Sequence, residues 1–147
     1  MKLIDHAETV VIVTAANLEP GHPDAVNGRR LCDEITRRGE GGTYRRAVLV
    51  SDIDWFETDL LDGAPTISIG GPGANAVTGR LAGELKAVWT DADRVIIQAR
   101  LDAGAPLVAL WGMDRHATAE AVEAFTSRGW LDEFLEKCWR FPTGNLA

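Results

Sequence analysis

The chain has little cysteine and no long apolar run, and both absences limit the class of protein. Its two cysteines, Cys32 and Cys138, stand alone in segments with helical patterns. Such a pair predicts free buried thiols in place of a disulfide framework or a thiolate metal site. No apolar run approaches the roughly 20 residues that a membrane-spanning helix requires. The first residues, MKLIDHAETVVIV, make a poor signal peptide, so we expect a cytoplasmic protein that does not interact with membranes.

Positive charge is also scarce. The chain carries 15 Lys and Arg against 22 Asp and Glu, which gives a formal net charge of −7. A protein that binds duplex nucleic acid needs a basic face to displace the counterions of the phosphate backbone, so nucleic acid is excluded as a general partner. The length of 147 residues and the hydrophobic content of 46% are typical of one globular domain, which we assign to residues 1–147.

Apolar runs and helical patterns alternate along the chain. Continuous apolar, β-branched runs at 9–14, 47–51, 66–69 and 107–111 predict strands that are buried on both faces. Helical patterns cover 23–39, the stripe from Val77 to Val88 closed by Trp89, and the last third at 118–127 and 130–140. The alternation predicts an α/β fold: a three-layer α/β/α sandwich with a mostly parallel sheet, flavodoxin- or Rossmann-like.

The segment 94–101 fits two structures. Val95, Ile97, Ala99 and Leu101 alternate with more polar neighbours, as in a half-exposed strand. The same segment also fits a helix that is capped by Asp91 and stopped by Gly104. We favour the strand, because helical propensity is weak across Val-Ile-Ile. It would pair with 107–111 as an antiparallel hairpin at one edge of the sheet.

A candidate ligand site follows from the fold class. Ligands of open parallel sheets bind outside the carboxyl ends of the strands, where the loops 17–22, 51–55, 70–75 and 112–116 should meet. The candidate ligand-binding residues there are Asn17, His22, Asp52, Gly70, Gly71, Gly73, Asn75, Asp114, Arg115 and His116. A metal site from His22 and His116 with Asp52 or Asp54 lacks short ligand spacing, and neither Ser51 nor Ser68 lies in a nucleophile elbow. We therefore assign no catalytic or metal-binding residue.

The stretch TISIGGPGANAVTGRL, residues 66–81, raises the question of a phosphate cradle. Residues 71–76 match the G-x-G-x-x-A form of the dinucleotide fingerprint. However, Pro72 has no N–H, the acidic partner of that fingerprint is out of place, and no Walker lysine follows. Two interpretations stay open. The helix start is a looser anion site with Arg115 or Arg80 as the counter-charge, or the glycines only supply unusual dihedrals and close strand–helix packing.

The run at residues 47–54 and the tryptophans also bear on function, but they indicate it less directly than the Gly-rich stretch. The run AVLVSDID, residues 47–54, looks like the nucleophile motif of haloacid-dehalogenase-type phosphatases, which would make Asp52 the nucleophile and Asp54 the general acid. The later acidic motif and lysine of those enzymes are missing, so turn and capping roles are favoured. Of the five tryptophans, Trp89, Trp130 and Trp139 fit helical stripes, whereas Trp55 is expected to be exposed in a loop, where it would suit a binding surface.

The segment ISIGGPGANAVTGRL and the later LVALWGMDRHATAEAVEAF together resemble, over residues 66–125, an α/β segment of archaeal surface-layer proteins. Those proteins carry a strand, a Gly-Gly-Pro-x-x-Asn turn and a helix, followed by an apolar strand with Gly-x-Asp and Thr. The matching residues here are Gly70, Gly71, Pro72, Asn75, Gly112, Asp114 and Thr118. The resemblance implies an α/β module that builds structure and self-associates, with no catalytic residues to carry over.

These observations lead to two functional expectations. The first is a non-catalytic interaction or sensing module that forms a homo-oligomer through its apolar, aromatic-rich terminal helices. The alternative is an enzyme or binder of an anionic small molecule, phosphate-bearing or a nucleotide, at the Gly-rich loop. The sequence names no cofactor for either, because fold class alone does not determine function.

Overall fold

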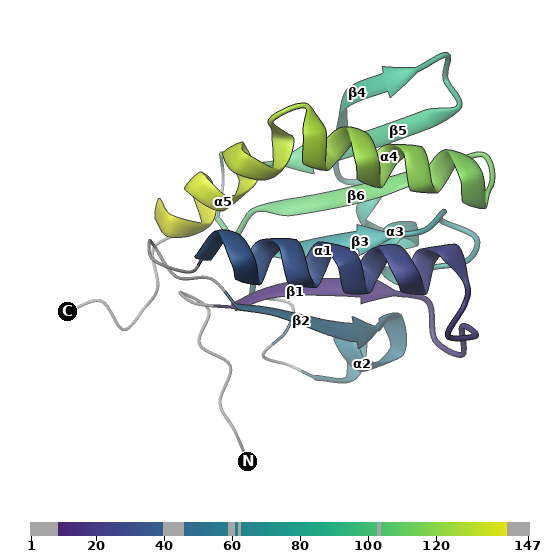
Figure 1. The fold of residues 1–147 in the computed structure, drawn as a ribbon, viewed down its shortest axis with the longest axis horizontal. Helices are drawn as coiled ribbons and strands as arrows, with labels where there is room; N and C mark the ends of the chain where they lie inside the picture. The colour runs from purple at the N-terminus through teal and green to yellow at the C-terminus, as the bar shows by residue number, and fades with distance from the viewer. Residues whose placement is uncertain (1–8, 40–45, 59–60, 62, 103, 141–147) are drawn as a thin grey trace.

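The computed structural model describes residues 9–39, 46–58, 61, 63–102 and 104–140, which form one six-stranded sheet with helices (Figure 1). The strands are β1 (Thr9–Thr14), β2 (Arg46–Ser51), β3 (Thr66–Ile69), β4 (Lys86–Asp91), β5 (Val95–Arg100) and β6 (Leu107–Gly112). Their order is β2-β1-β3-β6-β5-β4, with β2, β1, β3 and β6 parallel and β5 antiparallel to both of its neighbours. The prediction of an α/β fold with a mostly parallel sheet is confirmed.

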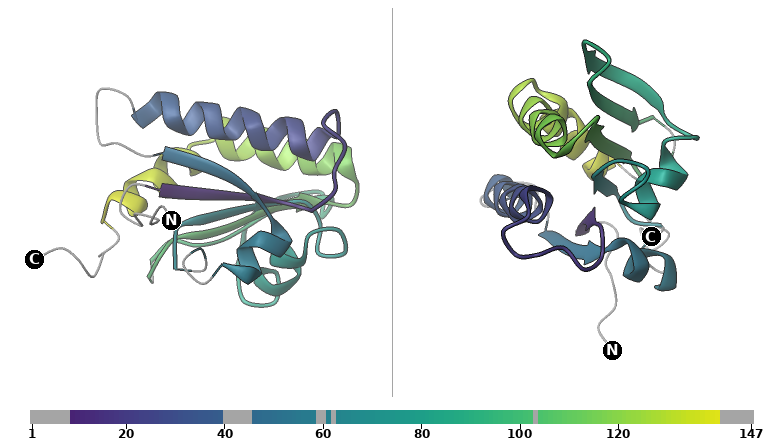
Figure 2. Two further views of the ribbon diagram at one scale, coloured as in Figure 1. Left: turned by 90° about the horizontal axis from the view of Figure 1, so that it is seen from below. Right: turned by 90° about the vertical axis from the view of Figure 1, so that its right-hand side faces the viewer.

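The helices are α1 (Pro23–Gly39), α2 (Asp52–Glu57), α3 (Ala76–Leu81), α4 (Arg115–Ser127) and α5 (Trp130–Arg140). The long helices α1 and α4 lie side by side over one face of the sheet, and the short helices α2 and α3 lie on the opposite side (Figure 2). Helix α1 has the ends that its sequence predicts, with Pro23 and Asp24 in the first turn and Arg37 and Arg38 in the last. None of the described helices has the length and apolarity needed to cross a bilayer.

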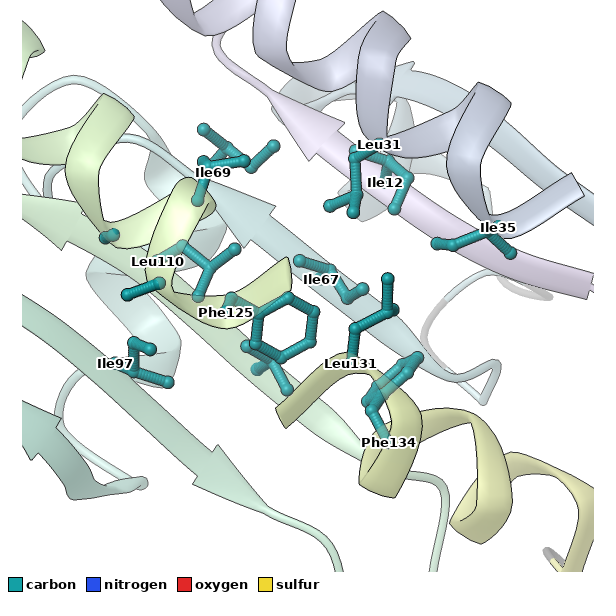
Figure 3. Close-up of a cluster of buried hydrophobic side chains, with 14 of the residues drawn as sticks. Ile12, Leu31, Ile35, Ile67, Ile69, Ile97, Leu110, Phe125, Leu131 and Phe134 are labelled. Atoms are coloured by element: carbon teal, nitrogen blue, oxygen red, sulfur yellow. The ribbon is translucent and has the colours of Figure 1, made fainter. Parts of the chain in front are cut away.

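The sheet separates two apolar cores. Alternate residues of β1 serve them: Val10 and Ile12 belong to the core under the long helices, and Val11 and Val13 to the core under the short ones. Figure 3 shows the first core, in which Leu31 and Ile35 of α1 meet side chains from the sheet and from the C-terminal helices. All six residues of β1 are buried, as expected for a central parallel strand.

Residues 76–91 correct the predicted long helix. Helix α3 ends at Leu81, and a turn leads into strand β4, which carries Val88 and Trp89. Leu85 is buried as its helical spacing requires, but Val88 is 38% exposed. The turn contains Gly83, and the Val-Trp-Thr run that follows has strong strand propensity, which explains the change of structure. The predicted strand at 94–101 is confirmed as β5, and β4 rather than β5 forms the edge.

Strand β2 differs from the expectation of a buried strand. None of its residues is buried, and Arg46 and Leu49 are exposed. Among the described strands β2 pairs with β1 alone, so it forms the second edge of the sheet. A short apolar run does not reveal whether a strand is central or outermost, because both kinds pack helices against their faces.

Candidate functional site

The loops that were expected to meet at the carboxyl edge of the sheet do so. The backbone N–H of Ala16, after β1, donates to the carboxylate of Asp52, after β2, at 3.0 Å. The side chain of Asn75, after β3, donates to the carbonyl oxygen of Val13 in β1 at 3.3 Å. The loop after β6 lies against the same group, because a Cβ atom placed on Gly71 would be 3.9 Å from the Gly112 carbonyl oxygen. The four parallel strands therefore bring distant segments together, as the sheet topology requires.

Asp52 is a structural group at the centre of this edge. Its side chain is buried, and its Oδ1 accepts hydrogen bonds from the N–H groups of Ala16 and Ile53. Its Oδ2 accepts the N–H of Ala76, the first residue of α3, at 2.9 Å. A carboxylate placed there satisfies the exposed donors at the helix starts and complements their positive ends. With both oxygens bonded to backbone N–H groups, Asp52 is positioned to hold three loops together rather than to attack a phosphorus atom.

Asn75 completes the same arrangement from a position with no exposed surface. Its Oδ1 caps α3 by accepting the N–H groups of Val77 at 2.9 Å and Thr78 at 3.3 Å. Its Nδ2 donates to the carbonyl oxygens of Val13 and Ile69, so it bridges the ends of β1 and β3. Asp52 and Asn75 together bond the first three N–H groups of α3. Those donors, which a phosphate at this helix start would need, already have protein acceptors.

The glycines of the Gly-rich loop have different surroundings. Gly70 is buried, has a φ of +117°, and donates its N–H to the carbonyl oxygen of Leu110 at 3.0 Å. A Cβ atom at Gly70 would lie 3.3 Å from Oδ2 of Asp24, so both the backbone conformation and the close approach favour glycine. Gly73 is exposed and has no atom within 4 Å of such a Cβ, and Gly71 is half-buried. Of these three, only Gly70 is required by its surroundings.

The remaining candidate residues lie at the outer part of the edge. Asp114 is the N-cap of α4 and accepts the N–H of Ala117 at 2.8 Å, and this hydrogen bond lowers the pKa of its carboxyl group. Arg115 and His116 are exposed in the first turn of α4. Asn17 is exposed with a φ of +65°, and the half-buried His22 accepts the N–H of Asp24 on Nδ1 at 3.0 Å. In this part of the molecule the candidate residues cap helices or face solvent.

Asp24 is a site residue that the sequence analysis did not identify. It lies in the first turn of α1, is 7% exposed, and its Oδ1 is buried without a hydrogen-bond partner among the described residues. Burial raises the pKa of its carboxyl group, although the charges of His22 and Arg115 oppose that shift. Its position after β1 could have placed it at the carboxyl edge. Its Oδ2 lies 3.3 Å from the position of a Cβ on Gly70, which is far away in the sequence.

Several other side chains bear on catalysis. The expected exposure of Trp55 is wrong: its side chain is 3% exposed, and its indole N–H donates to Thr66 Oγ1 at 3.3 Å. Ser51 accepts the N–H of Asp54 and caps α2, as expected for a turn. Burial raises the pKa of the Cys32 thiol to about 12, with a further contribution from Asp33, so the nucleophilic thiolate is scarce at neutral pH. Trp139 lies in α5, but its side chain is outside the described part of the structure.

The described residues also contain a hollow of about 380 Å³ away from the carboxyl edge. It is lined by Glu84, Leu85, Lys86, Val88, Ala99, Arg100, Leu101, Asp102, Trp130 and Glu133. Arg100 is paired with Leu107 at the start of β6, so the hollow lies at the opposite end of that strand from the candidate residues. None of the residues predicted to bind a ligand lines it.

Taken together, the carboxyl edge is held by helix caps and loop-bridging hydrogen bonds. Among the residues that the structure describes, no group of three or more His, Cys, Asp or Glu is placed to hold a metal ion. In comparisons with known proteins, the chain matches no protein-family model and no curated protein. Its function must therefore be inferred from its own geometry.

Proposed function

We propose that the chain is a non-catalytic interaction module that self-associates through strand β2 and helix α2. The observation that carries this proposal is an edge strand with exposed apolar side chains on both faces of the sheet beside it. Leu49 lies on the α1 face, where its side chain approaches Gly28, and α2 lies on the opposite face. Leu49 of β2 is 38% exposed, and Ile53 and Phe56 of α2 are 50% and 45% exposed. A partner that pairs with the edge of β2 would cover apolar side chains on both faces, which favours association at this edge.

The edge of β2 offers hydrogen bonds as well as apolar contact. Its inner side pairs with β1 along all six residues, from Arg46 to Ser51. Within the described part of the chain no strand pairs with its outer side, which presents the alternate N–H and C=O groups of an edge strand. The surface fits a second copy of the chain, because two β2 strands can pair antiparallel about a two-fold axis and join their sheets.

The charges along β2 favour the same two-fold arrangement. Arg46 is exposed at the start of the strand, and the acidic Asp54 and Glu57 are exposed just beyond its end. Antiparallel pairing centred between Val48 and Leu49 would place Arg46 of one copy opposite Ser51 of the other. Each cationic end would then lie near the acidic α2 of the second copy. This self-complementarity makes a second copy of the chain a better occupant than a protein of unspecified charge.

The non-catalytic part of the proposal rests on the occupied side chains of the carboxyl edge. Asp52, Asn75 and Asp114 all accept backbone N–H groups at helix starts. The alternative function, binding of an anionic molecule at the Gly-rich loop, has less support. The first three N–H groups of α3 are already bonded, and the carboxylate of Asp24 lies beside Gly70, where it would repel an anion.

The terminal helices are a weaker interface than the sequence implied. Leu131, Phe134 and Cys138 of α5 are buried in the core under the long helices, where Phe134 meets Phe125 of α4 edge to face. Their apolar face is used within the chain itself. Strand β2 and helix α2 therefore replace the terminal helices as the proposed interface.

Three finer expectations belong to the same proposal. We propose a three-layer sandwich of flavodoxin-like type, because helices lie on both sides of the sheet and its order begins β2-β1-β3. The resemblance of residues 66–125 to surface-layer modules implies self-association, which agrees with the proposed role. A cytoplasmic location is supported by the free thiols Cys32 and Cys138, because reducing compartments keep cysteines unpaired.

The experiment compares two edge strands by light scattering. Leu49→Lys places a charge on β2, and Val88→Lys makes the same change at an equally exposed residue, 38% in each case, on the opposite edge strand β4. We expect the wild type and Val88→Lys to be dimers and Leu49→Lys to be a monomer, because a buried lysine without a partner disfavours the β2 interface. A monomeric wild type, or a dimer that survives in Leu49→Lys, would contradict the proposal.

A further inference from the structure

The hollow of about 380 Å³ lies between the first turn of α5 and the hairpin of β4 and β5. Trp130 and Glu133 of α5 form one wall, and residues 84–86, 88 and 99–102 form the rest. Cavities that bind small molecules in proteins have volumes of roughly 300 to 1,000 Å³. The hollow therefore has room for a small ligand. It is separate from the β2 surface, because β4 is the opposite edge strand of the sheet.

A β-bulge in β4 shapes one side of the hollow. The register between β4 and β5 shifts between Ala87 and Trp89, so Val88 is an extra residue without a partner of its own. Bulges redirect side chains and are common at sheet edges and beside active sites. Val88 is 38% exposed and lines the hollow, as does Lys86, which pairs directly with Ala99. The start of β4 therefore brings an apolar and a cationic side chain to the same cavity.

The base of the hollow is apolar. Ala99, Leu101 and Trp130 are partly buried against the core under the long helices, and each still lines the hollow. Leu85, which is buried in the core under the short helices, lines it as well. An indole ring offers a large flat apolar surface against which a ring or an alkyl group packs well. A ligand with an apolar body would remove this surface from water.

The hollow is also bordered by five charged side chains, Glu84, Lys86, Arg100, Asp102 and Glu133. Two of the three acids have a cation nearby in the protein, because Asp102 lies 3.5 Å from Lys137 and Glu84 lies 3.8 Å from Arg80. Among the residues that the structure describes, Lys86, Arg100 and Glu133 form no ion pair. The charges that remain for a ligand are two cations and one carboxylate, and this excess favours an anion.

Lys86 is better placed than Arg100 to hold an anion over the apolar base. Residues directly opposite one another on antiparallel strands share a face of the sheet, so Lys86 extends from the same face as Ala99. Arg100 is the next residue of β5, and its side chain therefore starts from the opposite face. The ammonium group of Lys86 is thus the cation on the side of the sheet where Trp130 lies.

We propose that the hollow binds a small monocarboxylic acid with an apolar body, whose carboxylate pairs with Lys86 and whose body packs against Trp130 and Val88. A carboxylate supplies the ion-pair partner that Lys86 lacks in the described chain, and charge-assisted hydrogen bonds are stronger than neutral ones. An amine of the same shape would be repelled by Lys86 and Arg100. An inorganic phosphate would bring no apolar body to the base of the hollow.

The test is an NMR titration of the isotope-labelled full chain with benzoate, phenylacetate, indole-3-acetate and hexanoate. Each acid is compared with its amide, which has the same shape without the charge, and with the corresponding amine. We expect at least one acid to shift the backbone N–H signals of residues 84–88, 99–102 and 130–133 in a saturable manner, and to bind more tightly than its amide and its amine. The proposal is overturned if no acid gives saturable shifts there, or if the amide or the amine binds as tightly.

Variants of Lys86 test the position of the carboxylate. Lys86→Glu should weaken binding of the tightest acid roughly tenfold or more, as for the loss of one charge-assisted hydrogen bond. Lys86→Arg should retain binding, because it keeps the positive charge. Arg115→Glu makes the same change of charge at an exposed residue in the first turn of α4, far from the hollow, and should bind as the wild type does. Wild-type affinity in Lys86→Glu, or an equal loss in Arg115→Glu, would overturn the proposal.

Val88 provides a second test, because its side chain is exposed and its substitution is expected to leave the fold intact. Val88→Glu and Val88→Lys both remove the apolar side chain, but they place opposite charges beside the hollow. We expect Val88→Glu to bind the acid more weakly than Val88→Lys does, and equal affinities would contradict the site. Both variants change β4, whereas the dimer is expected at β2, so the failure of one proposal is distinguishable from the failure of the other.

Discussion

At the scale of single residues, the Gly-rich turn is explained by the two side chains that close it. Asp52 places a carboxylate at the start of α3, and Asn75 caps the next two N–H groups while it holds the carbonyl oxygens of β1 and β3. The turn thus has the donors of an anion site, but the protein's own oxygens occupy them. The glycine pattern in the sequence indicates only that the backbone of this turn is free to adopt unusual dihedrals. The carboxylate that accepts the first N–H of α3 belongs to Asp52, 24 residues before Ala76, so the local pattern could not reveal it.

Asp24 predicts a pH dependence of stability that its asparagine variant should remove. The pKa of this carboxyl group is raised above 3.8 in the folded protein, mainly by burial. The folded state therefore binds the proton more tightly than the unfolded state does. This tighter proton binding stabilises the folded protein fully below pH 3.8, and the stabilisation is lost as the pH rises through the pKa of Asp24 in the folded state.

We therefore expect Asp24→Asn to gain stability relative to the wild type between pH 4 and neutral pH. The gain should be on the order of 1 kcal/mol, as for relief of an unsatisfied buried polar group. Urea denaturation at several pH values measures the difference in unfolding free energy, and Asp93→Asn serves as the exposed control. A difference that is independent of pH, or that favours the wild type at neutral pH, would show that the Asp24 carboxylate is not destabilised by burial.

At the scale of elements, the end of α3 depends on a side chain from another strand. Gln98 of β5 donates from Nε2 to the carbonyl oxygens of Ala82 at 3.0 Å and Leu85 at 2.9 Å. Its Oε1 accepts the indole N–H of Trp111 in β6 at 2.7 Å. These bonds satisfy backbone carbonyls where the helix gives way to β4. The stripe of Val77, Leu81 and Leu85 alone favours a longer helix, so the local sequence could not show where α3 ends.

We expect Gln98→Leu to destabilise the protein by roughly 2 to 3 kcal/mol, because two carbonyl groups and an indole N–H would lose their partners. Gln98→Glu is the matched control, since the protonated glutamate keeps an acceptor for Trp111 and has one O–H donor in place of the two N–H donors. Its unfolding free energy, from chemical denaturation, should fall between those of the wild type and Gln98→Leu at a pH where the glutamate is neutral. If Gln98→Leu has wild-type stability, the side chain does not determine how α3 ends.

At the scale of the whole molecule, the sequence was sufficient to predict the central strands of the sheet but not which strands form its edges. The β-branched run at Thr9–Thr14 predicted a strand buried on both faces, and β1 is such a strand. The same reasoning failed for β2, because its position at the edge follows from the order of the strands and not from its composition. The convergence of the four loops was predictable from topology. The surroundings of Asp24 and Trp55 were not, because they include Gly70 and Thr66, which come from elsewhere in the chain.

The central claim, that two copies meet at β2, is tested most directly by hydrogen–deuterium exchange at two protein concentrations. The outward N–H groups of residues 46–51 should exchange more slowly in the concentrated sample, because pairing with a second copy protects them from water. Residues 86–91 of β4, the opposite edge, should exchange at the same rate in both samples. Exchange at 46–51 that does not depend on concentration would contradict the account.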